Sequence, residues 1–262
     1  MPRQSNPLRK IATLFLIAAA FCTLMIAASM PARSDTTGGS AAAADRRDEH
    51  QWSVSLLGVR AGTVRLSAEQ RGGSYRVDLD MRSEGAGAAI RRVRFVAGAE
   101  GRISSGRYAP ALYDENADTG RRQSRSTIEY RRGIPRITAY ESTSDHRLNT
   151  LDPATQAGTL DPATSFYAIL RDQPRASACT AAVVTFDGRR RTQTRLADPH
   201  PEGERITCRG EYRRLDGFRP EDMAERSRFP FTVIYEPTSD GLMRVAEVRV
   251  QTLYGAAVMK RR

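Results

Sequence analysis

Apolar and polar residues alternate strictly in several stretches of the chain. In "YRVDLDMR", from Tyr75 to Arg82, every second residue is apolar and the residues between them are arginine or aspartate. A period of two places the apolar residues on one face of a β-strand and the charged residues on the other. The segment therefore predicts a strand with one buried and one solvated face.

Other stretches repeat this pattern and are separated by turn residues. "WSVSLLGVRAGTVRLSAEQ" carries Trp52, Val54 and Leu56 at the same spacing. "RGGS", at 71–74, predicts a hairpin turn because Gly-Gly tolerates the positive φ that such turns need. Further strands are predicted in "IRRVRFVAGAEGRI", "RSTIEYRR", "IPRITAYES", "ITCRGEYRRL", "FPFTVIYEP" and "LMRVAEVRVQTLY".

One segment, "LDPATSFYAILRDQP", predicts a helix. Asp161 fits the N-cap and Pro162 fits the first helical position. The apolar residues that follow share one face of that helix: Phe166, Ile169 and Leu170. The phrase "TLDPAT" occurs twice, nine residues apart, and we interpret it as chance or as a repeated turn rather than as a repeat architecture.

These elements predict a mainly β fold, with a large twisted antiparallel sheet or an open β-barrel and one short helix. A single amphipathic helix is able to cover the concave face of such a sheet. A concave face filled by the helix would favour a structural module, whereas an open face would favour a binding protein.

The N-terminal residues follow a different pattern. "MPRQSNPLRK" is basic, and residues 11–28 are free of charge and mostly apolar, which predicts a cleaved secretory signal peptide at 1–32. Because the apolar run approaches membrane-spanning length, an uncleaved N-terminal membrane anchor is the alternative. Residues 33–50 are mostly small and polar and predict a flexible linker, and 51–262 predict a single β-rich periplasmic domain.

Arginine dominates the charge of the chain. The 262 residues carry a formal charge of +11, and only Lys10 and Lys260 are lysines. Loss of the three cations of the signal segment leaves +8. The arginines are interleaved with acids, whereas a nucleic-acid-binding protein gathers its cations on one face or helix. We therefore predict no nucleic-acid partner, and attraction to anionic lipid head groups or polysaccharide stays open.

Two cysteines, Cys179 and Cys208, follow the signal segment. In an oxidising compartment such a pair predicts a structural disulfide, here one that closes a loop around the Asp187-Gly188 turn. A redox function requires closely spaced, activated thiols such as Cys-x-x-Cys, and the sequence has no such motif.

The sequence offers no motif for catalysis or for metal binding. The three histidines, His50, His146 and His200, have no second histidine at ligand spacing, and we predict exposed loop positions for them. There is no Gly-x-Ser-x-Gly elbow, and the carboxylates show no specific spacing. The sequence thus predicts a protein that is not an enzyme and that holds neither a metal nor a cofactor.

The stretch "VVTFDGRRR", at 183–191, places three arginines after an Asp-Gly pair. A two-residue turn at Asp187-Gly188 would place Phe186, Arg189 and Arg191 on one face and so divide the arginines between faces. One interpretation is stacking of Arg189 on Phe186 at a sheet edge. The other is a cationic rim on an apolar cavity, suited to a ligand with an acidic head and an apolar tail. These three side chains are the candidate ligand-binding residues.

Several segments occur in an order typical of a known family. They are "WSVSLLGVRAG", "GRYAPALY", "LDPATSFYAILR", "VVTFDGRRR" and "CRGEYRRLDGF". The chain resembles the proteobacterial envelope family known as domain of unknown function 3108 from about Trp52 to Tyr254, with a more charged segment at 219–228. The resemblance implies a β-rich open barrel, similar to the lipoprotein carriers of the Lol system, and implies no activity and no site residues.

These observations together predict a non-enzymatic protein of the periplasm, peripheral to the membrane. As its ligand we predict an amphiphile, either a lipid or a lipoprotein, or an envelope polysaccharide. The alternative is a structural or assembly module that binds other envelope proteins through its sheet edges.

Overall fold

The computed structural model describes residues 45–143, 151–252 and 255–262. The predicted signal segment, residues 33–44 of the predicted linker and His146 lie outside this part of the chain. Within it, no helix is long and apolar enough to cross a membrane.

The described residues form thirteen strands and three short α-helices. The strands are β1 Arg46–Leu56, β2 Val59–Arg71, β3 Ser74–Ser83, β4 Arg94–Ser104, β5 Arg107–Asp118, β6 Gln123–Arg131, β7 Ile134–Ser142, β8 Ala182–Phe186, β9 Arg191–Glu202, β10 Arg205–Asp216, β11 Arg228–Pro237, β12 Met243–Thr252 and β13 Gly255–Arg261. The helices are α2 Ala86–Ile90, α3 Pro162–Leu170 and α4 Pro220–Glu225, with short 3-10 turns η2 Pro153–Thr155 and η3 Arg175–Ser177.

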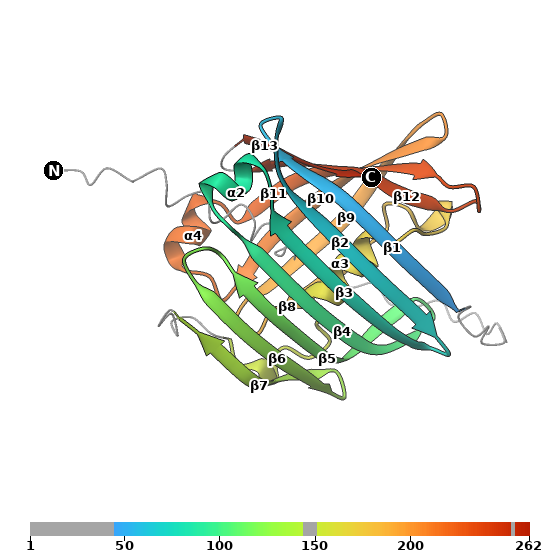
Figure 1. Cartoon of the computed structure of the whole chain (residues 1–262). Coiled ribbons are helices and arrows are strands. Elements are labelled where there is room, and N and C mark those ends of the chain that lie inside the picture. The colour runs from blue at the N-terminus through green and yellow to red at the C-terminus, as the bar shows by residue number, and fades with distance from the viewer. Residues whose placement is uncertain (1–44, 144–150, 253–254) are drawn as a thin grey trace.

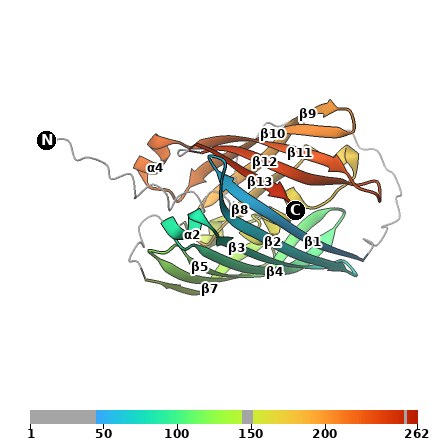
Figure 2. The ribbon, with the colours of Figure 1, turned by 45° about the horizontal axis from the view of Figure 1, so that its top comes forward.

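All thirteen strands belong to one antiparallel sheet, in the order β7-β6-β5-β4-β3-β2-β1-β13-β12-β11-β10-β9-β8 (Figure 1). Because β1 pairs with β13, the first and last strands meet in the middle of the sheet. The sheet bends over on itself, so that β9–β13 form one layer and β2–β7 form the facing layer (Figure 2). The predicted mainly β fold with an open barrel is confirmed.

Local sequence explains the strand pairing well in the first half of the sheet. In β3 the apolar residues of "YRVDLDMR" are buried and the charged residues between them face outward. The preceding turn consists of Gly72 and Gly73, which have φ of 56° and 78°, and Arg71 pairs with Ser74 across it. Glycine adopts this left-handed backbone without steric cost, so the predicted Gly-Gly hairpin is confirmed.

The first strand begins earlier than the sequence predicted. Residues 46–50, assigned to the linker, pair with β2 from Arg46↔Gln70 to His50↔Leu66. Their side chains keep the alternation of Trp52, with Asp48 and His50 buried and Arg47 and Glu49 exposed. The prediction was wrong here because polar residues on a buried face do not show as an apolar pattern.

A single long segment connects the two outermost strands, β7 and β8. Its described part, residues 151–181, is called the crossing segment below and contains α3. Near its start, the Gly158 N–H donates to Gly133 O at 2.9 Å and the Leu160 N–H donates to Val184 O at 2.7 Å. The crossing segment therefore lies between the two ends of the sheet, which do not pair with each other.

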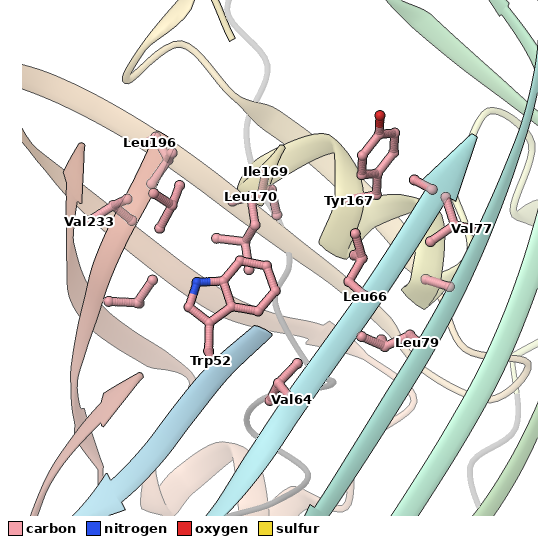
Figure 3. Close-up of a cluster of buried hydrophobic side chains, with 14 of the residues drawn as sticks. Trp52, Val64, Leu66, Val77, Leu79, Tyr167, Ile169, Leu170, Leu196 and Val233 are labelled. Atoms are coloured by element: carbon pink, nitrogen blue, oxygen red, sulfur yellow. The ribbon is translucent and has the colours of Figure 1, made fainter. Parts of the chain in front are cut away.

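Helix α3 occupies the concave face of the sheet. Seven of its nine residues are buried: Pro162, Ala163, Thr164, Ser165, Tyr167, Ile169 and Leu170. Figure 3 shows Leu170 and Ile169 beside Trp52, with Val64 and Leu66 on one side and Leu196 and Val233 on the other. The helix thus joins the two layers of the sheet into one core.

Asp161 begins this helix as predicted. Its carboxylate accepts the Thr164 N–H at 2.8 Å and the Thr164 hydroxyl at 2.6 Å. The prediction of one short helix was incomplete, because α2 and α4 are also helical. With five and six residues, both are too short to show a 3.6-residue period.

Candidate functional site

The predicted disulfide joins Cys179 to Cys208, and both cysteines are buried. It attaches the end of the crossing segment to β10 and closes a loop that contains β8 and β9. A loop with this sequence separation of 29 residues corresponds to about 3–4 kcal/mol of stabilisation through the unfolded chain. Disulfides of this kind form in oxidising compartments.

The arginine-rich hairpin between β8 and β9 has a longer turn than predicted. Phe186 pairs with Arg191, not with Arg189, so residues 187–190 form a four-residue loop. The Asp187 side chain causes this, because Oδ1 accepts the Arg189 N–H at 2.8 Å and the Arg190 N–H at 2.7 Å. The predicted two-residue turn was wrong for that reason.

This loop separates the three candidate ligand-binding residues. Phe186 is fully buried, and Arg191 lies opposite it in the strand pair. Arg189 lies in the loop, and its Nη1 reaches the Tyr140 hydroxyl of β7 at 3.4 Å. Anion binding by Phe186, Arg189 and Arg191 stays a prediction, for which the structure places two of the three together.

Carboxylates lie close to the arginines of the 187–190 loop. Burial raises the pKa of Glu115 to about 7, against a hydrogen bond from the Tyr113 hydroxyl at 2.7 Å that lowers it. The Asp187 carboxylate raises it further, and Arg189 lowers it. The arginines of the loop therefore share their surroundings with acids and do not form a purely cationic grip.

The outer face of the sheet also mixes both charges. A hollow of about 780 Å³ crosses β1–β5, and its lining includes Arg65, Arg76, Asp78 and Asp80. Ion pairs connect neighbouring strands here, as between Arg76 and Glu100 at 3.3 Å. This face does not have the single sign of charge that nucleic-acid recognition uses.

Besides the arginine-rich loop, a cluster of polar side chains lies inside the barrel, where β1 meets the end of α3. It consists of Asp48, His50 and Asp172 and is called the β1–α3 cluster below. One side-chain ligand atom of each residue lies within 4.8 Å of the others. Asp48 and His50 point inward from β1, and Asp172 follows α3 by two residues.

The two carboxylates of the β1–α3 cluster are held by separate partners. Asp48 receives hydrogen bonds from Arg46 Nε and Nη2 at 2.8–2.9 Å and from the Tyr167 hydroxyl at 2.5 Å. The Asp172 carboxylate is 3.4 Å from Arg261 Nη1. Burial raises the pKa of Asp172, and the nearby Arg261 lowers it.

His50 lies between these ion pairs and is only 4% exposed. Its Nε2 is 3.8 Å from Asp48 Oδ1, and its ring centroid is 5.4 Å from that of Trp52. Among the described residues, neither ring nitrogen has a hydrogen-bond partner. Burial lowers the pKa of His50 to about 4, and Arg261 adds to the effect. The imidazole is therefore neutral at physiological pH.

Sequence reasoning missed this cluster. His50 was predicted to be an exposed loop residue, which is wrong. His200 is exposed as predicted, but it lies on β9 and not in a loop. The alternation of β1 is the signal that could have found two of its members. Asp48 and His50 lie four and two residues before Trp52, and therefore on the same buried face of the strand. Asp172 has no such signal, because only the tertiary fold brings it to β1.

The fold and its filled interior define a β-barrel-like protein with an internal helix. The model of a family described as "Protein of unknown function (DUF3108)" matches residues 51–238, and the chain belongs to this family. The predicted resemblance is thereby confirmed. No match is found among the curated proteins.

The solved structures similar to this chain include one whose similarity extends over most of both chains. It is a crystal structure of a β-barrel-like protein of the domain of unknown function DUF1849 from Brucella abortus. The two chains are 13% identical with a TM-score of 0.40, and the similarity covers 82% of this chain and 94% of the other.

Proposed function

We propose that the protein is a non-enzymatic envelope module that binds another envelope protein, and that it is not a container for a lipid. The observation that carries this proposal is the filled concave face, where seven of the nine residues of α3 are buried. In a lipid carrier this face would hold the ligand. A role in the periplasm is supported by the disulfide and by the predicted signal peptide.

The surface best suited to a partner is the outer edge of β7, which pairs with no second strand among the described residues and has η2 of the crossing segment packed nearby. Ile134 and Tyr140, both on this strand, are 41% and 42% exposed. Residues 138–141 are exposed on both faces of the strand. A long, exposed edge strand offers unpaired backbone groups to a strand of a partner, which adds to the sheet by β-augmentation.

The other edge of the sheet is less accessible. Strand β8 has five residues, and Leu160 of the crossing segment lies beside Thr185 of that strand. The Phe186 N–H donates to Leu160 O at 2.8 Å, so part of this edge is already occupied. We therefore assign partner binding to the edge of β7.

A matched pair of lysine substitutions tests the β7 edge. Ala139→Lys adds a charge to the edge strand, and Ala111→Lys adds the same charge to an exposed position of β5 inside the sheet. A photo-crosslinker at Tyr140 is used to capture the partner from envelope extract. We expect discrete crosslinks that Ala139→Lys removes and Ala111→Lys preserves, because an edge charge opposes strand addition.

Two results would contradict this function. Crosslinks that survive Ala139→Lys, or that are absent from the unsubstituted protein, would exclude the β7 edge as the partner surface. Organic extraction followed by mass spectrometry tests the container: one lipid per chain would instead establish amphiphile binding.

A further inference from the structure

We propose that Asp48, His50 and Asp172 bind a divalent transition metal ion, for which Zn²⁺ fits best. The β1–α3 cluster offers one imidazole nitrogen and two carboxylates, a ligand set that suits zinc. The ligand atoms lie within 4.8 Å of one another. Ligands about 2.1 Å from a tetrahedral ion are about 3.4 Å apart, so side-chain shifts on the order of 1 Å would close the site.

The unpartnered imidazole of His50 is the observation that points to a ligand. The side chain is buried, yet neither ring nitrogen has a hydrogen-bond partner in the described part of the chain. Buried polar groups are nearly always satisfied, and an exception calls for a missing partner. Nε2 lies on the side of the Asp48 carboxylate, 3.8 Å from Oδ1, which is where a shared ion would sit.

The residues that hold the carboxylates of Asp48 and Asp172 are also consistent with a metal site. Ligating carboxylates are usually held in place by further hydrogen bonds, which orient them toward the metal. Arg46 and Tyr167 hold Asp48 in this way, and Arg261 lies beside Asp172. Three protein ligands leave a fourth tetrahedral position for water.

The site also has a structural consequence. Asp48 and His50 belong to β1, whereas Asp172 belongs to the crossing segment just after α3. An ion bound by all three residues would link the crossing segment to strand β1 of the sheet. Because the ion would bind the folded chain alone, it would raise the thermal unfolding midpoint. This inference does not depend on the partner proposed for β7.

The test compares two histidines of the same chain. The purified protein is treated with EDTA and dialysed, and then Zn²⁺ is added while calorimetry measures the stoichiometry and scanning fluorimetry measures the unfolding midpoint. His50→Ala removes the proposed ligand, and His200→Ala removes an exposed histidine on β9 as the control. We expect one ion per chain in the unsubstituted protein and in His200→Ala, and binding weakened about tenfold or more by His50→Ala.

A second variant separates loss of the metal site from misfolding, and a second ion reports the coordination geometry. Asp172→Asn changes a partly buried carboxylate with little change of shape, and circular dichroism checks the fold of each variant. Co²⁺ in place of Zn²⁺ reports tetrahedral coordination through its visible absorption, which we expect both His50→Ala and Asp172→Asn to abolish. Zinc binding that is absent from the unsubstituted protein, or unaffected by both folded variants, would overturn the proposal.

Discussion

At the scale of single residues, environment decides what a titratable side chain does. Glu115 shares a strand face with the fully buried Tyr113, and burial raises the pKa of its carboxyl to about 7. His50 shows the opposite direction for a base, since burial lowers the pKa of its imidazole to about 4. Both shifts favour the neutral form, as expected where the charged form loses its hydration.

Glu115→Gln should stabilise the protein at neutral pH. The unfolded chain releases the Glu115 proton near the ordinary pKa of 4.5, whereas the folded chain keeps it up to about 7. The contribution of Glu115 to stability is therefore greatest below about pH 4.5 and is lost as the pH rises through about 7. Urea unfolding of the variant, compared with the unsubstituted protein, should show an advantage that grows across this window and then levels off.

Asp114→Asn is the control for that series, because Asp114 is the exposed neighbour on the same strand. The comparison separates the effect of the buried Glu115 carboxyl from the loss of any acidic side chain on this strand. A flat pH dependence for Glu115→Gln would mean that the folded and unfolded chains release this proton together.

At the scale of elements, short sequence motifs were sufficient to predict where several helices and strands begin. The repeated "TLDPAT" phrase forms two Asp-Pro starts: Asp152 caps η2 and Asp161 caps α3. The first copy thus begins a 3-10 turn and the second begins an α-helix. Strand parity was also reliable, while the register of the β8–β9 hairpin depended on one side chain, Asp187, which no pattern of apolar residues reports.

The two caps offer a matched test of burial. Asp161→Ala should lower the free energy of unfolding by about 1–3 kcal/mol, because it leaves the Thr164 N–H without a partner in the core and leaves the Thr164 hydroxyl with Tyr75 alone. Asp152→Ala removes an exposed cap that accepts the Ala154 N–H at 2.9 Å, and should cost about 1 kcal/mol or less. Chemical denaturation measures both, and equal losses would show that burial does not set the cost.

At the scale of the whole molecule, the crossing segment turns a bent sheet into a filled barrel. It is held to the sheet at separate points: the Gln173 N–H donates to Met243 O at 3.0 Å, and Cys179 is bonded to Cys208. Ahead of both points in the chain, α3 contributes Leu170 to the core that both layers share. A single leucine therefore connects parts of the chain that are far apart in sequence.

Leu170→Ala should lower the free energy of unfolding by about 2–5 kcal/mol, since it opens a cavity at the joint of the two layers. Leu57→Ala is the matched control, because Leu57 is 67% exposed at the β1–β2 turn, and it should cost about 1 kcal/mol or less. Urea denaturation followed by tryptophan fluorescence measures both, with Trp52 reporting from the core. A loss below about 1 kcal/mol for Leu170→Ala would mean that the helix does not support the sheet.

The sequence by itself determined the β class, the Gly-Gly hairpin, the helix at Asp161, the disulfide pair and the family. Each of these rests on neighbouring residues, on the two cysteines that follow the predicted signal segment, or on motifs in a fixed order. Tertiary structure alone decided that β1 begins at Arg46, that α3 fills the concave face, and that Asp172 comes to lie beside Asp48 and His50. Contacts between residues more than a hundred positions apart leave no periodic trace in the chain. Alternation along β1 indicates Asp48 and His50, but only the folded sheet brings Asp172 to them.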